Sequence, residues 1–140
     1  MRAIVQRVSE ASVTVGGERI SHIGPGLLVL LGVQWDDTTE QADRMASKLA
    51  ALRIFEDDEG RMNRSVIDTG GQILCVSQFT LYGDTRKGNR PGFAAAAPAD
   101  QAEPLYERVR TTLGADGGRF GAHMELALVN DGPVTLLVEA

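Results

Sequence analysis

Residues 26–33, GLLVLLGV, form the longest apolar run of the chain and decide its fold. The run is far too short to span a bilayer. Apolar side chains occupy every position instead of alternate ones, which predicts a strand at Leu27–Gly32 that is buried on both faces. The rest of the fold is expected to pack around this strand.

Strand signals precede this run, and a helix follows it. The apolar patterns and the hairpin glycines Gly16-Gly17 predict three strands, at Arg2–Val8, Ser12–Val15 and Arg19–Ile23. A helix opens at Thr38, because Thr38 and Gln41 match a capping box.

The C-terminal half also contains strand and helix patterns, on both sides of one long loop. Glycine, proline and charged residues dominate Gly83–Pro98, which predicts a loop. The other elements are a strand at Gln72–Phe79, a helix that begins near Asp100 or at Pro104, and closing strands at His123–Val129 and Val134–Glu139. This order predicts an α/β single domain, with one mixed, strongly curved, half-barrel-like β-sheet and two helices packed on it.

Charge and cysteine content narrow the function classes. The chain has 14 basic and 19 acidic residues, a net charge of −5. This charge argues against broad binding to nucleic-acid phosphates but leaves room for a small basic patch. A single cysteine, Cys75, excludes an intrachain disulfide, and the N-terminus has no apolar signal segment. We therefore expect a cytoplasmic protein without membrane contact.

The common catalytic motifs are absent. The chain has no Gly-x-Ser-x-Gly elbow, no His-Glu-x-x-His and no phosphate-binding Walker loop. We interpret His22 and His123 as structural or surface residues, Cys75 as a small buried hydrophobe, and residues 56–59 as a solvated acidic turn. No cluster has metal-ligand spacing, so no metal or other cofactor is expected.

Two segments contain polar or conformationally unusual residues that a strand or a turn alone does not require. At Ser77-Gln78-Phe79-Thr80, an apolar strand ends in three polar side chains around one aromatic. The pattern fits either a capped strand end or a cluster of hydroxyl and N–H groups that binds a carbonyl or an amine. Residues 130–135 contain Gly132-Pro133, which fits either a tight turn between strands or a close ligand contact without a blocking Cβ.

A third segment gathers positive charge in an otherwise acidic chain. Arg86, Lys87 and Arg90 lie within the predicted loop. One interpretation is a solvated loop. The other is a loop that contacts nucleic-acid phosphates, since local cations position such a backbone.

Together these segments resemble the D-aminoacyl-tRNA deacylase family, formerly the D-tyrosyl-tRNA deacylases. The matching stretches are RAIVQRV at 2–8, RIF at 53–55, GRMN at 60–63, SQFTL at 77–81, TRKG at 85–88 and NDGPVT at 130–135. One departure is Gly92, where the family pattern leads us to expect serine. The resemblance covers essentially the whole chain and implies one deacylase-like domain at residues 1–140.

The resemblance implies an editing enzyme that cleaves the ester of D-aminoacyl-tRNA and of glycyl-tRNA mischarged on tRNA(Ala). It also implies a homodimer, in which Gly132 and Pro133 of one subunit, held by Arg7, enter the site of the other. Crowding by the carbonyls of a cis Gly132–Pro133 bond would exclude L-aminoacyl-tRNA. The segment from Ser77 to Thr80 would form the pocket floor. The tRNA contacts would be Arg86, Lys87 and Arg90.

The lack of an evident general base bears on the mechanism. The resemblance implies that the vicinal hydroxyl of the terminal tRNA ribose assists, while backbone N–H groups near Gln78 to Thr80 hold the oxyanion. The alternative makes the Thr80 hydroxyl a nucleophile, although nothing beside it in sequence would activate it. Two other classes stay open: a non-catalytic nucleic-acid-binding dimer with contacts at residues 86–90, and a plain scaffold protein.

Overall fold

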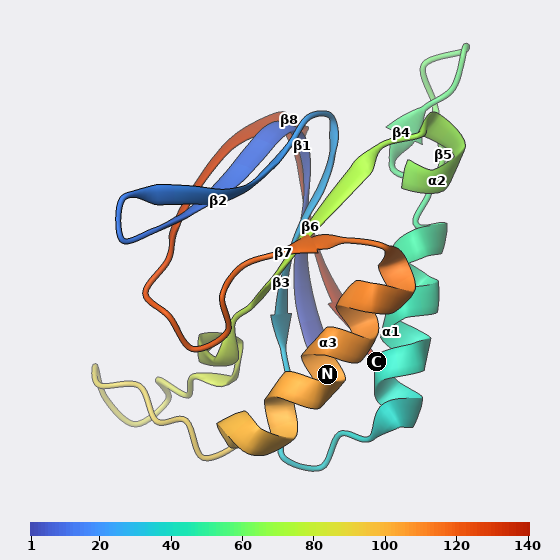
Figure 1. The fold of residues 1–140 in the computed structure, drawn as a ribbon. Helices are drawn as coiled ribbons and strands as arrows, with labels where there is room; N and C mark the ends of the chain where they lie inside the picture. Colours follow the sequence, from blue (N-terminus) through green and yellow to red (C-terminus); the bar gives the residue numbers. More distant parts are fainter.

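A six-stranded mixed sheet forms the centre of the molecule, and two long helices cover one of its faces (Figure 1). The computed structural model describes residues 1–140. The strands run in the order β2-β1-β3-β6-β7, and β8 pairs with β1. Their bounds are β1 Arg2–Val15, β2 Glu18–Ile23, β3 Gly26–Gly32, β6 Gln72–Ser77, β7 Asp116–Gly117 and β8 Glu125–Glu139. This architecture confirms the predicted mixed α/β fold with a curved sheet.

The strand β3 is buried on both faces, as its sequence predicts. Leu27, Val29 and Leu31 belong to the core between the sheet and the helices, whereas Leu28 belongs to a second core on the opposite face. The strand runs parallel to β6, and a parallel pair needs a crossover connection, which here contains α1.

The helices α1 (Thr39–Ala51) and α3 (Ala99–Leu113) lie side by side against this sheet (Figure 1). The predicted capping box is present, and the N–H of Thr38 donates to Gln41 Oε1 at 2.8 Å. The second helix begins near Asp100, and Pro104 lies inside it instead of in its first turn.

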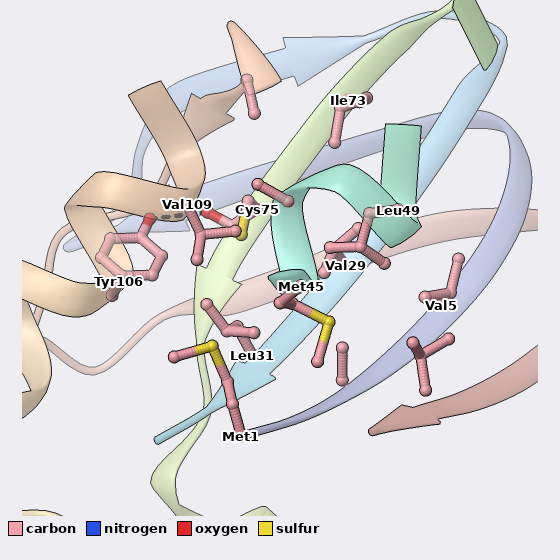
Figure 2. Close-up of a cluster of buried hydrophobic side chains, with 14 of the residues drawn as sticks. Met1, Val5, Val29, Leu31, Met45, Leu49, Ile73, Cys75, Tyr106 and Val109 are labelled. Carbon is pink, nitrogen blue, oxygen red and sulfur yellow. Dashed lines mark hydrogen bonds between the residues drawn. The ribbon is translucent and has the colours of Figure 1, made fainter. Parts of the chain in front are cut away.

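The core between the helices and the sheet surrounds Cys75 (Figure 2). The Tyr106 hydroxyl donates to the Cys75 carbonyl at 2.6 Å and ties α3 to β6. Burial raises the pKa of the Cys75 thiol to about 12. A thiol that stays protonated behaves as a small apolar side chain, which agrees with the sequence-based interpretation.

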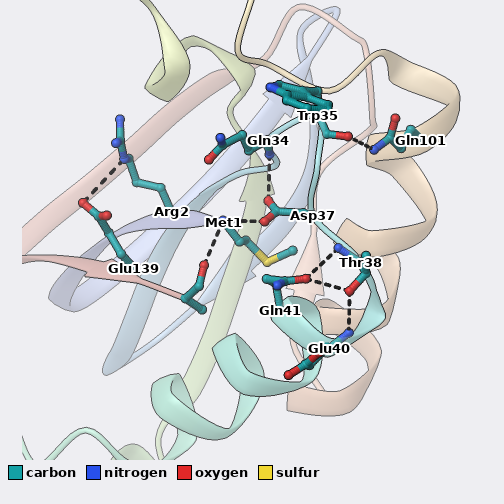
Figure 3. A network of polar contacts seen from close by, with 11 residues as sticks. Met1, Arg2, Gln34, Trp35, Asp37, Thr38, Glu40, Gln41, Gln101 and Glu139 are labelled. Atoms are coloured by element: carbon teal, nitrogen blue, oxygen red, sulfur yellow. Dashed lines mark hydrogen bonds and ion pairs between the residues drawn. The ribbon is translucent and has the colours of Figure 1, made fainter.

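A buried ion pair ties both ends of the chain to the start of α1 (Figure 3). The Met1 ammonium donates to the Asp37 carboxylate at 2.8 Å and to the Ala140 carbonyl at 3.1 Å. The same carboxylate accepts the Gln34 N–H at 2.8 Å. These contacts fix the segment between β3 and α1.

Two predicted pairs of strands are each a single strand in the structure. β1 continues through the expected gap between Val8 and Ser12, and β8 continues through Gly132 and Pro133. The separate strands predicted there, including His123–Val129 and Val134–Glu139, are therefore wrong. The two long strands pair with each other from Arg2 opposite Glu139 to Thr14 opposite Glu125. The pairing breaks in the polar middle, where Arg7, Ser9 and residues 131–134 have no partner, and it resumes on both sides.

Three smaller features complete the chain. Two of them were not predicted: a hairpin of β4 (Phe55–Glu56) and β5 (Met62–Arg64), and the short helix α2 (Val66–Thr69). The predicted loop Gly83–Pro98 contains no helix or strand, only residues in isolated bridges. None of the helices has both the length and the apolar character needed to cross a membrane.

Candidate functional site

The polar segment predicted as a site lies where β6 leaves the sheet. The strand ends at Ser77, two residues before the predicted end at Phe79, and a 3-10 turn follows at Phe79–Tyr82. The Gln78 N–H still donates to the Leu31 carbonyl of β3 at 2.8 Å. A Cβ on Gly32 would lie 3.2 Å from the Gln78 carbonyl oxygen, so glycine lets this turn pack closely against β3.

A cavity of about 490 Å³ opens beside this turn. Its walls come from the ends of β3 and β6, the start of α3, the segment before β8, and β8 itself. The lining residues are Val33, Val76, Ser77, Gln78, Phe79, Ala97, Ala99, Ala102, Phe120, Gly121, Ala122, His123, Met124 and Leu126. Mostly apolar walls with few polar groups are typical of small-molecule pockets, and the volume falls in their usual range.

The four predicted pocket-floor residues do not share one position. Ser77, Gln78 and Phe79 line the cavity, whereas Thr80 lies outside its wall and is exposed. The Gln78 side-chain amide donates to the Thr80 hydroxyl oxygen. Hydrogen bonding within the 3-10 turn begins at Leu81, whose N–H donates to the Gln78 carbonyl at 3.2 Å. The turn therefore leaves the N–H groups of Phe79 and Thr80 without a partner inside it.

The only titratable side chain that lines the cavity is His123. From the sequence we interpreted His123 as a structural or surface residue, and the segment from Phe120 to Met124 was not predicted as a cavity wall. The available signal was an aromatic residue within a glycine-rich stretch, at Gly117-Gly118-Arg119-Phe120-Gly121. No three His, Cys, Asp or Glu side chains are grouped so that they could hold a metal ion.

The Gly132–Pro133 segment is an exposed irregularity inside β8, not a turn between two strands. Pairing with β1 shifts register between Gln6 and Glu10, and the Gly132–Pro133 peptide bond is cis. Gly132 has φ +138°, and a Cβ there would lie 2.8 Å from the Val134 nitrogen. The position is therefore closed to larger residues.

The side chain of Arg7 holds this segment in place. Its side chain is buried, with 7% exposure for the residue. Nε donates to the Asp131 carbonyl at 3.1 Å, and Nη1 donates to the Ile54 carbonyl at 2.6 Å. An ion pair of 3.4 Å to the Asp131 carboxylate adds to these bonds. One guanidinium thus joins the residue before Gly132 to the base of the β4–β5 hairpin.

The chain does not bring Gly132 and Pro133 to its own cavity. Neither residue lines it. Arg7 pairs with Leu27 of β3, and Ser77 pairs with Leu31, four residues further along the same strand. The Arg7 region and the end of β6 are therefore separated by about 13 Å along the strands. From β8 to β6 there are three strand spacings, about 14 Å. The predicted site residues therefore form two separate groups within one chain.

The basic loop is only partly available for an anionic partner. The Arg86 guanidinium forms an ion pair with Asp84. Nε donates to one carboxylate oxygen at 2.9 Å, and Nη2 donates to the other at 2.8 Å. This guanidinium lowers the pKa of Asp84 to about 2. Lys87 and Arg90 are exposed and form no ion pair. Phe93 contacts the ring of Phe79 edge to face at 5.1 Å and joins the loop to the cavity rim.

Comparison with known proteins gives a consistent result over the full length. The model of the D-Tyr-tRNA(Tyr) deacylase family matches residues 4–139. D-aminoacyl-tRNA deacylases from Symbiobacterium thermophilum and Brevibacillus brevis are each 59% identical, covering all of this chain and 96% and 100% of their own lengths.

Solved structures agree with this fold. One, described as c-Myc DNA Unwinding Element Binding Protein, superposes with a TM-score of 0.95 at 47% identity and covers 100% of this chain and 99% of its own. Another, described as "a probable eukaryotic D-amino acid tRNA deacylase", has a TM-score of 0.84 at 20% identity, covers 99% and 98%, and supports the fold alone. By its sequence and fold, the chain belongs to the D-Tyr-tRNA(Tyr) deacylase family.

Proposed function

We propose that the protein hydrolyses the ester bond between tRNA and a D-amino acid, releasing both. The observation that carries this proposal is the mostly apolar cavity at the end of β6, in a chain of a deacylase family. The cavity has room for the aminoacylated end of a single strand, and such exposed ends are common targets of specific RNA recognition. The proposed reaction belongs in the cytoplasm, where aminoacyl-tRNA is used.

The substrate itself supplies the reactive hydroxyl in this proposal. Thr80 is a poor nucleophile here, because its hydroxyl oxygen meets the Gln78 amide, which is not a base. The vicinal hydroxyl of the terminal ribose instead assists the attack of water on the ester. The N–H groups of Phe79 and Thr80, free within their turn, stabilise the developing oxyanion. The protein contributes orientation and charge stabilisation.

A second copy of the chain completes the site in this proposal. β8 pairs with β1 on one edge only, and it exposes Val129, Leu136 and Leu137 around the Gly132–Pro133 segment. Long exposed apolar edges in native proteins are normally covered. A two-fold homodimer covers both copies of such an edge with one contact. The Gly132–Pro133 segment of each subunit then enters the cavity of the other.

This arrangement gives a chiral filter. The backbone of the inserted Gly132–Pro133 segment crowds one side of the substrate α-carbon, where an L side chain would lie. A D side chain points the other way and is accepted. Glycine has no side chain to exclude, so glycyl-tRNA mischarged on tRNA(Ala) is hydrolysed as well.

Matched substrates test the proposal. The purified protein is incubated with D-, L- and glycyl-tRNA, and ester loss is followed over time. We expect rapid loss of the D and glycyl esters and survival of the L ester. Equal cleavage of the D and L esters contradicts the chiral filter, and stability of all three contradicts the deacylase proposal.

A second candidate function is non-catalytic nucleic-acid binding, which the name of the 47% identical solved structure favours. The exposed Lys87 and Arg90 are its natural contacts. The net charge of −5 favours a local contact over a wide binding surface. This function predicts tight, strongly salt-dependent binding of uncharged tRNA or single-stranded DNA without any ester loss.

A further inference from the structure

The rim of the cavity contains one side chain that the proposed reaction leaves without a role. The deep lining residues are buried, among them Val33, Val76 and Ala102. The exposed lining residues are Phe79, Ala99, Gly121 and His123. If the last nucleotide of an RNA strand occupied the cavity, the rest of the RNA would leave the cavity past this rim.

His123 is the only rim residue that can carry charge. It forms no ion pair, whereas His22, the other histidine of the chain, lies 3.9 Å from Glu10 on a different part of the sheet. Arg119 begins the turn that precedes His123, closed by the Ala122 N–H to the Arg119 carbonyl at 3.1 Å. Arg119 is also exposed and forms no ion pair. This turn therefore presents positive charge next to an uncharged cavity.

Acidic groups also belong to the surrounding elements. Glu125 follows on the same segment, Asp100 and Glu103 lie on α3 near the wall residues Ala99 and Ala102, and Asp36 follows β3. All four are exposed, and none of them lines the cavity. Exposed charges are screened by solvent, so an anion at the rim meets the imidazole without a competing carboxylate in direct contact.

We propose that His123 binds the phosphate of the terminal nucleotide as the strand leaves the cavity, in a contact that positions the substrate. This inference rests on the proposed function. The imidazole has N–H groups that can donate to a phosphate oxygen, and a hydrogen bond to an ionised acceptor is stronger than one between neutral groups. The contact is present before and during the reaction, which means that it strengthens binding more than it speeds the chemical step.

Adenosine 5′-monophosphate is a suitable probe, since it carries the base, ribose and single phosphate of a terminal nucleotide. The two histidines give two sets of imidazole NMR signals, which His22→Gln and His123→Gln assign. We expect the nucleotide to shift the His123 signals and leave those of His22 in place, with a smaller effect from adenosine. His123→Gln should weaken nucleotide binding about two- to fivefold, the size of one exposed charged contact.

Three variants make this test decisive. His22→Gln should bind like the wild type, His123→Gln should bind more weakly, and His123→Arg should bind well. With D-aminoacyl-tRNA, His123→Gln should raise KM about two- to fivefold while kcat changes less. Unchanged nucleotide binding in His123→Gln, or no nucleotide binding by the wild type, overturns the proposal. Nucleotide binding with the expected pattern but without any deacylation overturns only the proposed function.

Discussion

The end of β6 and the Gly132–Pro133 segment of β8 are held in opposite ways. Ser77 and Gln78 are fixed by backbone pairing to β3, and residues 77–79 form one wall of a cavity that the same chain completes on several sides. Gly132 and Pro133 are exposed on a strand with a free edge, held mainly by Arg7, and they do not line that cavity.

In the proposed dimer, this difference divides the tasks of one site between two subunits. A wall that binds substrate gains from rigid support within one chain, because orientation errors of about 1 Å cost about a hundredfold in rate. A segment that acts on another subunit has to stay exposed and still be rigid. Arg7 holds the segment through Asp131, which leaves Gly132 and Pro133 exposed for the partner that we propose.

The largest expected effect comes from closing the exposed segment. Gly132→Ala places a Cβ 2.8 Å from the Val134 nitrogen and 3.1 Å from Arg7 Nη2, at φ +138°. We expect kcat/KM for D-aminoacyl-tRNA to fall about a hundredfold or more. Gly60→Ala is the control, since Gly60 also has a positive φ, +77°, but has open space around it. A wild-type rate in Gly132→Ala would exclude this segment from the site.

Removing the support of that segment should have the next largest effect. Arg7→Met leaves the Ile54 and Asp131 carbonyls without their donor. We expect the free energy of unfolding to fall by about 2–3 kcal/mol and the deacylation rate to fall with it. Urea denaturation measures the stability. Arg44→Met is the control, since it breaks only an exposed ion pair with Glu40 within a helix. It should lower the free energy of unfolding by less than about 0.5 kcal/mol. An equal loss of stability in both variants would contradict the supporting role of Arg7.

In the segment that follows β6, substitution of Thr80 should lower the deacylation rate less than the two changes above. Thr80→Ala removes one hydrogen bond to Gln78, so we expect a two- to tenfold lower rate, about the value of one neutral hydrogen bond. Thr80→Ser should restore most of it. A substrate without the free vicinal hydroxyl on its terminal ribose should be nearly inert. An inactive Thr80→Ala together with a fully reactive deoxy substrate would make Thr80 the nucleophile.

The smallest effect should come from the basic loop, which belongs to neither region. Lys87→Ala and Arg90→Ala should each reduce the slope of log K for tRNA against log salt by about 0.7. Arg86→Ala should reduce it less, since Asp84 already pairs with that guanidinium. Because the pKa of Asp84 is lowered to about 2, this pair is complete above about pH 4 and is lost as pH falls through 2. A loss for Arg86→Ala as large as that for Arg90→Ala would contradict the pairing.

Local patterns in the sequence were sufficient for much of the fold. The uninterrupted apolar run at 26–33 identified β3 because burial on both faces leaves no alternation. Thr38 and Gln41 located the start of α1, since a capping box is made by residues three apart. Both signals involve only neighbours in the chain.

The errors arose where partners are distant in sequence. β1 and β8 looked interrupted because their middles are polar, at Ser9-Glu10 and Asn130-Asp131. Their mutual pairing shifts register in these polar middles and resumes on both sides, so each strand is continuous in the structure. In the same way, Phe120 and His123 become cavity residues because their segment lies beside the end of β6. No local period encodes that approach.

The central claim is that each active site combines the cavity of one subunit with the Gly132–Pro133 segment of the other, and co-expression tests it most directly. One chain carries Gly132→Ala and keeps an intact cavity. The other carries Ala99→Trp, which fills the cavity from its exposed rim, and keeps an intact segment. Each variant alone should be nearly inactive, while the mixture should recover roughly a quarter of wild-type activity, since half of the dimers are mixed and each has one intact site. A mixture no more active than the separate variants would contradict the account.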